Sequence, residues 1–313
     1  MTDAAEPEAL LTAARSGDRG SLARLLSLVE RGGPAARQVG RLTHPLGGAG
    51  YAVGITGAPG AGKSMLTNAL ISQIRHDGSQ VAVLAIDPSS PFTGGAILGD
   101  RIRMQDHTVD PGVFIRSMAT RGHLGGLSLA TLEAIRLLDA TSWPWILVET
   151  VGVGQIEVDV AGAADTTVVV VNPGWGDAVQ ANKAGLLEIA DIFVINKADR
   201  PGVDHTRRDL DRMLDLTETK GWRPPVLSTV AITGDGVEDL WRAVEAHRLH
   251  LLQTGELEAR RRARVSDELT EIVAALLRER AKEAVGERLD RLAEQVASRA
   301  IDPWTAAHDL LPD

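Results

Sequence analysis

A glycine-rich stretch at residues 57–64 carries the residues with the clearest chemistry. It reads GAPGAGKS, a full match to the pattern GxxxxGK[ST], and it lies between an apolar run and a helix expected over residues 65–74. Glycines let backbone N–H groups surround a phosphate chain, and the N-terminus of a following helix favours negative charge. A glycine-rich turn without a ligand is the alternative, but the complete motif in a strand–loop–helix setting argues against it. We expect these residues to contact nucleotide phosphates: Gly57, Ala58, Pro59, Gly60, Ala61, Gly62, Lys63, Ser64 and Met65.

Two side chains of this stretch have specific roles in such a motif. The lysine, Lys63, reaches the β- and γ-phosphates, and the serine hydroxyl, on Ser64, binds Mg²⁺. We therefore expect a nucleoside triphosphate with magnesium as its counter-ion.

The tetrapeptide NKAD at residues 196–199 predicts which base the nucleotide carries. It follows an apolar run and matches the NKxD pattern of GTPases. The Asp199 carboxylate can accept hydrogen bonds from the N1–H and the exocyclic amine of guanine, a donor pair that adenine lacks. Asn196 and Lys197 would brace the loop and the ring. Alone, the tetrapeptide could be an ordinary strand-to-helix loop, but downstream of a phosphate motif it favours GTP.

Acidic residues at strand ends complete the predicted site. The run WILVE ends at Glu149, in the position where an acid usually holds Mg²⁺ through water, and Gly152 could sense the γ-phosphate through its amide. Glu149 replaces the aspartate of the Ras-like DxxG pattern. Asp87 ends another apolar run, and the carboxyl ends of parallel strands face the ligand crevice. For Asp100, in an expected loop, a helix N-cap is an equally simple interpretation.

Together with Lys63 and Ser64 of the phosphate motif, these acids form the predicted catalytic site and the predicted Mg²⁺ site. The catalytic set is Lys63, Asp87, Asp100 and Glu149. The Mg²⁺ set is Ser64, Asp87, Asp100 and Glu149.

Short apolar runs alternate with helical stretches and must position these motifs. Strands are expected at residues 51–56, 81–87, 145–149, 166–171, 192–196 and 225–229. Continuous apolar strands separated by helices are typical of a parallel sheet covered on both faces. The fold class is therefore α/β: a three-layer P-loop NTPase with a mostly parallel sheet and with N- and C-terminal helical extensions.

Helical periodicity without strands occupies both ends of the chain. We expect an N-terminal helical extension at residues 1–48, a P-loop GTPase domain at 49–250 and a C-terminal helical arm at 251–313. A long charged helix is expected over 256–285. Its run of three arginines at 260–262 is interpreted as a solvated helix face rather than a nucleic-acid patch.

Composition excludes several classes of protein. The 313 residues carry a formal net charge of −9 and include no cysteine. An acidic protein is a poor match for nucleic acid, and without cysteine there are no disulfides or thiolate metal sites. No apolar run approaches the roughly 20 residues that span a bilayer, and the acidic N-terminus does not fit a signal peptide. We expect a cytoplasmic protein that binds neither membrane nor nucleic acid, and we expect no transition-metal site at His107, His123 or His205.

The motifs and the segments between them resemble one family. GAPGAGKS, AIDPSSPFTGGAILGDRIRM, FIRSMATRGHLGGLS, VETVGVGQIEVDVAGAADTTVVVVNPGWGDAVQANKAG and INKAD, in this order, are similar to the MeaB/ArgK P-loop GTPases, relatives of the human methylmalonic aciduria type A protein. The resemblance covers at least residues 40–250. It implies a homodimeric GTPase chaperone that gates adenosylcobalamin loading and protects methylmalonyl-CoA mutase. The cobalamin would belong to the partner, because no DxHxxG segment occurs here.

The resemblance also implies roles for individual residues. Residues 172–183 match a partner-responsive segment of the family, and with Gly152 the candidates are Asp177, Gln180 and Lys183. The guanine-binding set becomes Asn196, Lys197, Asp199, Val230, Ala231 and Ile232. Val230 stands where the family usually has serine, so we expect the loop to lose an internal hydroxyl bond. Base affinity should be weaker and base specificity unchanged, since the backbone N–H of Ala231 can still reach the guanine oxygen.

Other functions remain alternatives at this point. A kinase linked to amino-acid transport, a metallochaperone GTPase and a nucleotide-dependent binding module share the same motifs. The partner could be methylmalonyl-CoA mutase or a related acyl-CoA mutase. Intrinsic hydrolysis should be slow, because no catalytic glutamine or arginine finger is evident. Arg116 and Arg121, expected in exposed loops, are candidates that a partner could reorganise.

Overall fold

The computed structural model describes residues 5–87, 107, 109–119, 126–150, 162–174, 188–216 and 221–310. Several predicted residues lie outside these ranges: Asp100, Arg121, His123, Gly152, Asp177, Gln180 and Lys183. The chain forms two compact units, Met1–Arg262 and Ala263–Asp313.

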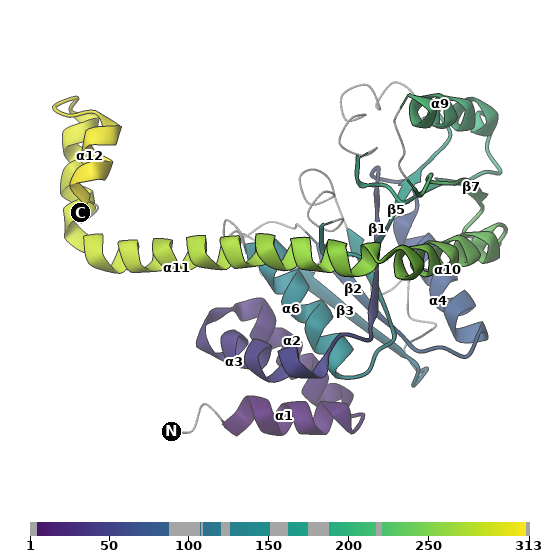
Figure 1. Cartoon of the computed structure of the whole chain (residues 1–313), viewed down its shortest axis with the longest axis horizontal. Helices are drawn as coiled ribbons and strands as arrows, with labels where there is room; N and C mark the ends of the chain where they lie inside the picture. The colour runs from purple at the N-terminus through teal and green to yellow at the C-terminus, as the bar shows by residue number, and fades with distance from the viewer. Residues whose placement is uncertain are drawn as a thin grey trace. The chain divides into compact units, whose positions relative to one another are not determined.

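A seven-stranded parallel sheet forms the centre of the first unit (Figure 1). The strands are β1 (Tyr51–Gly57), β2 (Val81–Asp87), β3 (Val113–Ala119), β4 (Trp145–Thr150), β5 (Thr166–Val171), β6 (Ile192–Asn196) and β7 (Val226–Thr229). Their order in the sheet is β3-β2-β4-β1-β5-β6-β7. The predicted α/β P-loop NTPase class is confirmed.

Helices cover both faces of the sheet, which explains why most of its strands are largely apolar. On one face lie α4 (Lys63–His76) and α10 (Val237–Thr254); on the other lie α6 (Gly126–Ala140) and α9 (Val203–Asp215). Side chains of β2 alternate between the two layers: Val81 and Val83 contact the α4 side, whereas Leu84 and Ile86 contact the α6 side. The result is a three-layer unit.

Three N-terminal helices belong to the core of the first unit. They are α1 (Ala5–Arg15), α2 (Arg19–Arg31) and α3 (Gly33–Thr43), followed by the short 3-10 helix η1 (His44–Leu46). Asp18 caps α2 by accepting hydrogen bonds from the backbone N–H groups of Gly20 and Ser21. Leu25 and Leu26 are fully buried in the same apolar cluster as Leu84 and Ile86 of β2. The helices thus complete one layer over the β2 and β3 end of the sheet.

This packing makes a prediction about stability. Replacing Leu25 with alanine leaves a cavity between α2 and the sheet layer, so the free energy of unfolding should fall by about 3 kcal/mol. Urea unfolding of the full chain measures this change. Leu216→Ala is the control, because Leu216 is 87% exposed and its truncation should change stability by less than about 0.5 kcal/mol. Equal stability of the two variants would contradict the integration of α2 into the core.

Strand β3 is absent from the sequence prediction, and its composition explains why. It reads VFIRSMA, so Arg116 and Ser117 interrupt the apolar run. Arg116 was expected in an exposed loop. Instead it lies within β3, and its guanidinium donates hydrogen bonds to the Ser27 hydroxyl (3.1 Å) and the Glu30 carboxylate (3.0 Å) of α2. Arg116 holds α2 against the sheet. The expectation that it lies in an exposed loop was therefore wrong.

Two further helices of the described residues are α11 (Glu256–Ala297) and α12 (Pro303–Leu310). The helical conformation of α11 is interrupted at Gly286, with φ 36° and ψ −129°. Asp302 caps α12 by accepting from the N–H groups of Trp304 and Thr305. Within the second unit, leucine and valine side chains four residues apart are about half exposed: Val265, Leu269, Val273 and Leu277. Across the described part of the chain, no helix combines the length and the apolarity needed to cross a membrane.

Candidate functional site

The phosphate motif lies in the turn between β1 and α4, as predicted, and its geometry requires glycine. Gly57 has φ 128°, and a Cβ there would overlap the backbone of Val170 in β5. Gly62 has φ 94°, and a Cβ there would overlap the side-chain amide of Asn196. L-residues with a side chain rarely adopt these backbone angles. The loop can therefore lie close to β5 and β6 only because these positions lack side chains.

Lys63 is the first residue of α4, and its side chain folds back over the loop. The ammonium donates to the carbonyl oxygens of Gly57 (2.7 Å) and Ala58 (3.2 Å). The residue is only 7% exposed, so its positive charge sits in a poorly solvated position at the start of a helix. Such a charge, added to the helix N-terminus, suits an anionic ligand.

Glu149 lies at the carboxyl end of β4, next to β1 in the sheet. Its carboxylate accepts a hydrogen bond from the Ser64 hydroxyl at 2.6 Å, and it is 1% exposed. Two residues 85 positions apart, both predicted as Mg²⁺ ligands, are thus in direct contact. A hydroxyl and a carboxylate are the hard oxygen donors that Mg²⁺ prefers, and the ion usually completes its shell with waters and phosphate oxygens. The pair therefore fits a magnesium ion.

The third predicted acid, Asp87, ends strand β2. Its neighbour in the strand, Ile86, pairs with Thr150, the residue after Glu149. Asp87 is therefore placed at the same edge of the sheet as Glu149, although its side chain lies outside the description.

Asn196 joins the phosphate loop to the predicted base-binding loop. Its amide nitrogen donates to the carbonyl of Ala61 (2.8 Å), while its amide oxygen accepts from the Thr229 hydroxyl and the Ala231 N–H, both at 3.1 Å. The residue is 2% exposed. Three segments that are far apart in sequence are held together by this one side chain. These contacts hold the loop, whereas contact with a guanine ring stays a prediction.

The other two polar residues of the tetrapeptide, Lys197 and Asp199, have different surroundings. Lys197 has φ 59° and donates from its ammonium to the carbonyl of Gly60 at 2.6 Å, a second link to the phosphate loop. Asp199 is exposed and therefore accessible to a ligand. The N–H of Ala198 donates to the carbonyl of Thr229 at 3.0 Å, which fixes the loop against β7.

The loop after β7 contains Val230, whose side chain has no hydroxyl, and it is held by other hydrogen bonds. Thr233 donates its hydroxyl proton to the Asp235 carboxylate at 2.8 Å, and Val230 N donates to the carbonyl of Asp235 at 2.9 Å. The loop therefore has an internal hydroxyl bond, supplied three residues after the position where the family usually has serine. The Ala231 N–H, expected to reach guanine, is already bonded to Asn196, and Ile232 is 80% exposed beside it.

Sequence reasoning did not name Thr229 or Thr233 as parts of the site. The stretch LSTVAITGDG, which contains both hydroxyls, was singled out only for Val230 and Ala231. A threonine at the end of a strand, next to a buried asparagine in the neighbouring strand, was the available signal for Thr229.

The two described histidines considered as metal ligands contact residues of α4 and α9. His107 lies 3.4 Å from the Ser72 hydroxyl, and His205 lies 3.0 Å from the Asp209 carboxylate. Within the described ranges, no group of three or more histidine, aspartate or glutamate side chains is arranged to hold a metal ion.

Comparison with known proteins agrees with the motifs. A family model described as "Methylmalonyl Co-A mutase-associated GTPase MeaB" matches residues 22–286. A protein of Pyrococcus abyssi is 51% identical over 310 residues, covering 97% of this chain and 95% of the relative. The GTPase ArgK of Escherichia coli is 38% identical over 255 residues, covering 78% and 76%. A crystal structure described as an LAO/AO transport system kinase is similar with TM-score 0.73 and 28% identity, covering 98% of this chain and 96% of that one.

Proposed function

Because the chain belongs to the MeaB family of methylmalonyl-CoA mutase-associated GTPases, we propose that it hydrolyses GTP as a chaperone of an adenosylcobalamin-dependent mutase, gating cobalamin loading and protecting the enzyme. That the chain is a P-loop GTPase follows from the family. The partner and the chaperone role are the proposed part. The observation that carries the nucleotide chemistry is the Asn196 side chain, which ties the phosphate loop to the base loop.

The proposed chemistry is in-line attack of water on the γ-phosphate. In phosphoryl transfer, catalysis comes mainly from positioning and charge neutralisation. Lys63 supplies positive charge at the start of α4, and the glycine turns bring backbone N–H groups toward the phosphate chain. Ser64 and Glu149 would hold Mg²⁺, which when bound neutralises charge on the β- and γ-phosphates.

Slow intrinsic hydrolysis is part of the proposal. Arg116 was one candidate for a catalytic arginine. Its guanidinium is instead engaged in hydrogen bonds to α2. Hydrolysis would then be accelerated by groups that the partner supplies or orders, and turnover would report contact with the mutase.

A second copy of the chain is the other proposed partner. The half-exposed stripe of Val265, Leu269, Val273 and Leu277 has the four-residue spacing of one helix face, and a long helix usually buries such a face. We propose a homodimer formed through α11. Light scattering on the full chain measures its mass.

The decisive experiment measures phosphate release from GTP with and without purified methylmalonyl-CoA mutase. We expect at least a tenfold stimulation together with a complex on gel filtration, and the Lys63→Ala variant serves as the control for contaminating GTPases. Absence of both stimulation and complex would refute the mutase chaperone role.

Two further measurements on the purified protein distinguish a GTPase chaperone from a kinase and from a metallochaperone. Transfer of labelled γ-phosphate to an added acceptor would instead indicate a kinase. Stoichiometric nickel or zinc in the purified protein would indicate a metallochaperone.

A further inference from the structure

Two of the three arginines in the run at 260–262 are not the solvated helix face that the sequence suggested. Arg260 and Arg261, in the first turns of α11, form ion pairs with aspartates at the amino ends of the sheet strands. Arg262 is exposed. We call Arg261–Asp165 and Arg260–Asp191 the arm-root ion pairs. All four residues belong to the first compact unit.

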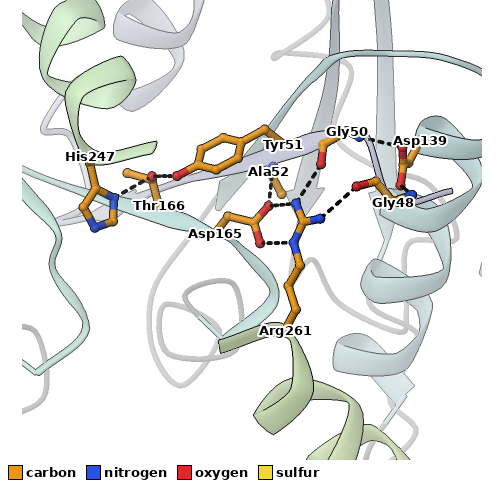
Figure 2. A network of polar contacts seen from close by, with 9 residues as sticks. All are labelled: Gly48, Gly50, Tyr51, Ala52, Asp139, Asp165, Thr166, His247 and Arg261. Carbon is orange, nitrogen blue, oxygen red and sulfur yellow. Dashed lines mark hydrogen bonds and ion pairs between the residues drawn. The ribbon is translucent and has the colours of Figure 1, made fainter. Parts of the chain in front are cut away.

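Asp165 holds β1 to β5. Its N–H donates to the carbonyl of Ala52 (2.8 Å), and its carboxylate accepts from the N–H of Ala52 (3.1 Å). Arg261 donates to both carboxylate oxygens, at 3.1 and 2.7 Å, and to the carbonyls of Gly50 (2.8 Å) and Gly48 (3.1 Å) (Figure 2). One guanidinium therefore binds both the residue that enters β5 and the segment that enters β1, a segment that the Asp139 carboxylate also holds through the N–H of Gly50 (2.6 Å).

Asp191 makes the equivalent connection between β5 and β6. Its N–H donates to the carbonyl of Thr167 (2.9 Å), and its carboxylate accepts from the N–H of Thr167 (2.8 Å). Arg260 donates to the other carboxylate oxygen at 2.9 Å. The indole N–H of Trp222 donates to the carbonyl of Asp191 at 2.8 Å. The two aspartates thus repeat one arrangement across three adjacent strands.

The aspartates of the arm-root ion pairs are buried, so loss of an arginine should affect the structure around them. The Asp165 side chain is 2% exposed and the Asp191 side chain 10% exposed, so each arginine compensates the charge of a carboxylate that water solvates poorly. Burial raises the pKa of Asp191, and Arg260 opposes that rise. A carboxylate left without its arginine would draw in water or shift the strand that carries it.

Neutral groups fill the space beside the arm-root ion pairs. The Tyr51 and Thr166 hydroxyls lie 2.6 Å apart, and the same Thr166 hydroxyl lies 2.8 Å from Nδ1 of His247 (Figure 2). Burial raises the pKa of Tyr51 to about 12, and burial with the nearby Arg260 lowers the pKa of His247 to about 3. Both rings are neutral at ordinary pH, so the arm-root ion pairs are not weakened by titration there.

The opposite ends of the same three strands carry the nucleotide site. β1 ends at Gly57, where the phosphate loop begins, and Gly57 pairs with Val170 of β5. β6 ends at Asn196, which binds Ala61 of the phosphate loop. The relative placement of the phosphate and base loops therefore depends on the register of β1, β5 and β6.

We propose that Arg260 and Arg261 are positioning residues for the nucleotide site, holding β1, β5 and β6 so that the phosphate loop and the guanine loop engage one GTP together. The proposal rests on GTP as the ligand. In this proposal the first turns of α11 set the distance between the phosphate loop and the guanine loop, although they do not contact the nucleotide.

The test separates misplacement of the subsites from damage to either one. Inorganic tripolyphosphate occupies only the phosphate loop, whereas GTP needs both loops. In Arg261→Gln we expect GTP affinity to fall about tenfold, a typical coupling between distant sites, while tripolyphosphate affinity changes less than about twofold. Isothermal titration calorimetry with Mg²⁺ on the full chain measures both. The matched control is Arg262→Gln, which removes the same charge from the next position and should leave both affinities unchanged.

Two results would contradict the positioning role of Arg261. Unchanged GTP affinity in Arg261→Gln, or equal weakening of both ligands, would overturn the proposal. If Arg261→Gln does not fold, Arg261→Lys keeps the charge but lacks the paired N–H donors, and the same two criteria apply to it. If the unaltered protein binds tripolyphosphate but not GTP, the failure lies in the nucleotide assignment instead.

Discussion

Lys63→Ala is expected to lower GTP turnover by about 100- to 1,000-fold, because the variant loses the only charged side chain of the phosphate motif. The ammonium already lies at the loop, bonded to the carbonyls of Gly57 and Ala58, so it needs little rearrangement to meet phosphate oxygens. Preorganised charge of this kind contributes about 3 to 4 kcal/mol to transition-state stabilisation. Phosphate release from GTP, measured in single-turnover and steady-state assays, gives the effect.

A second substitution on the same helix provides the comparison. Ser72→Ala changes an exposed residue of α4 whose hydroxyl contacts the Asn68 carbonyl and the His107 ring, and turnover should stay within twofold of the unaltered protein. Circular dichroism on both variants checks that each is folded. Turnover of Lys63→Ala above one tenth of the original would show that the phosphate motif is not the catalytic centre.

The architecture was predictable because the strands of a parallel sheet are buried on both faces. Three runs, at 81–87, 166–171 and 192–196, match β2, β5 and β6 residue for residue. The others differ from β1, β4 and β7 by one residue at one end, where a strand passes into a loop. β3 escaped prediction because Arg116 lies on it as part of an ion pair with α2, a contact that no local pattern announces.

The candidate site was predictable as far as its motifs are local. GAPGAGKS and NKAD specify Lys63, Ser64 and Asn196, and the fold then places them together. The Thr229–Asn196 hydrogen bond and the arm-root ion pairs depend on residues brought together by topology. Arg261 and Asp165 are 96 positions apart, and a basic run on a charged helix looks identical whether it faces water or a buried carboxylate.

The same topology suggests how a partner could act on the nucleotide. In the first unit, the nucleotide loops lie at the carboxyl edge of the sheet and the arm-root ion pairs at its amino edge, joined by three buried strands. Packed strands have few alternative arrangements, so a shift at one edge must be accommodated at the other. A protein that binds α11 could therefore alter GTP affinity without covering the nucleotide.

Asp199→Asn is expected to weaken GTP binding by about 100- to 1,000-fold and to make xanthosine triphosphate the preferred nucleotide. Without the carboxylate, the complex with GTP would lose two charge-assisted hydrogen bonds from guanine donors, which together contribute about 3 to 4 kcal/mol. Xanthine carries a carbonyl in place of the exocyclic amine, so the asparagine amide can donate to it. Asp199 is exposed, so the substitution should leave folding intact.

Competition binding with GTP, ATP and xanthosine triphosphate measures the switch in base preference. Asp204→Asn is the matched control, since Asp204 is an exposed aspartate five residues away in the first turn of α9 and should leave nucleotide preference unchanged. The Asn196 bonds to Ala61 and Ala231 should survive in both variants, because the switch alters the base-binding group and not its support. Equal affinity of the unaltered protein for ATP and GTP would refute guanine recognition by this loop. Retained GTP preference in Asp199→Asn would assign that recognition to the loop after β7, where Ile232 is exposed.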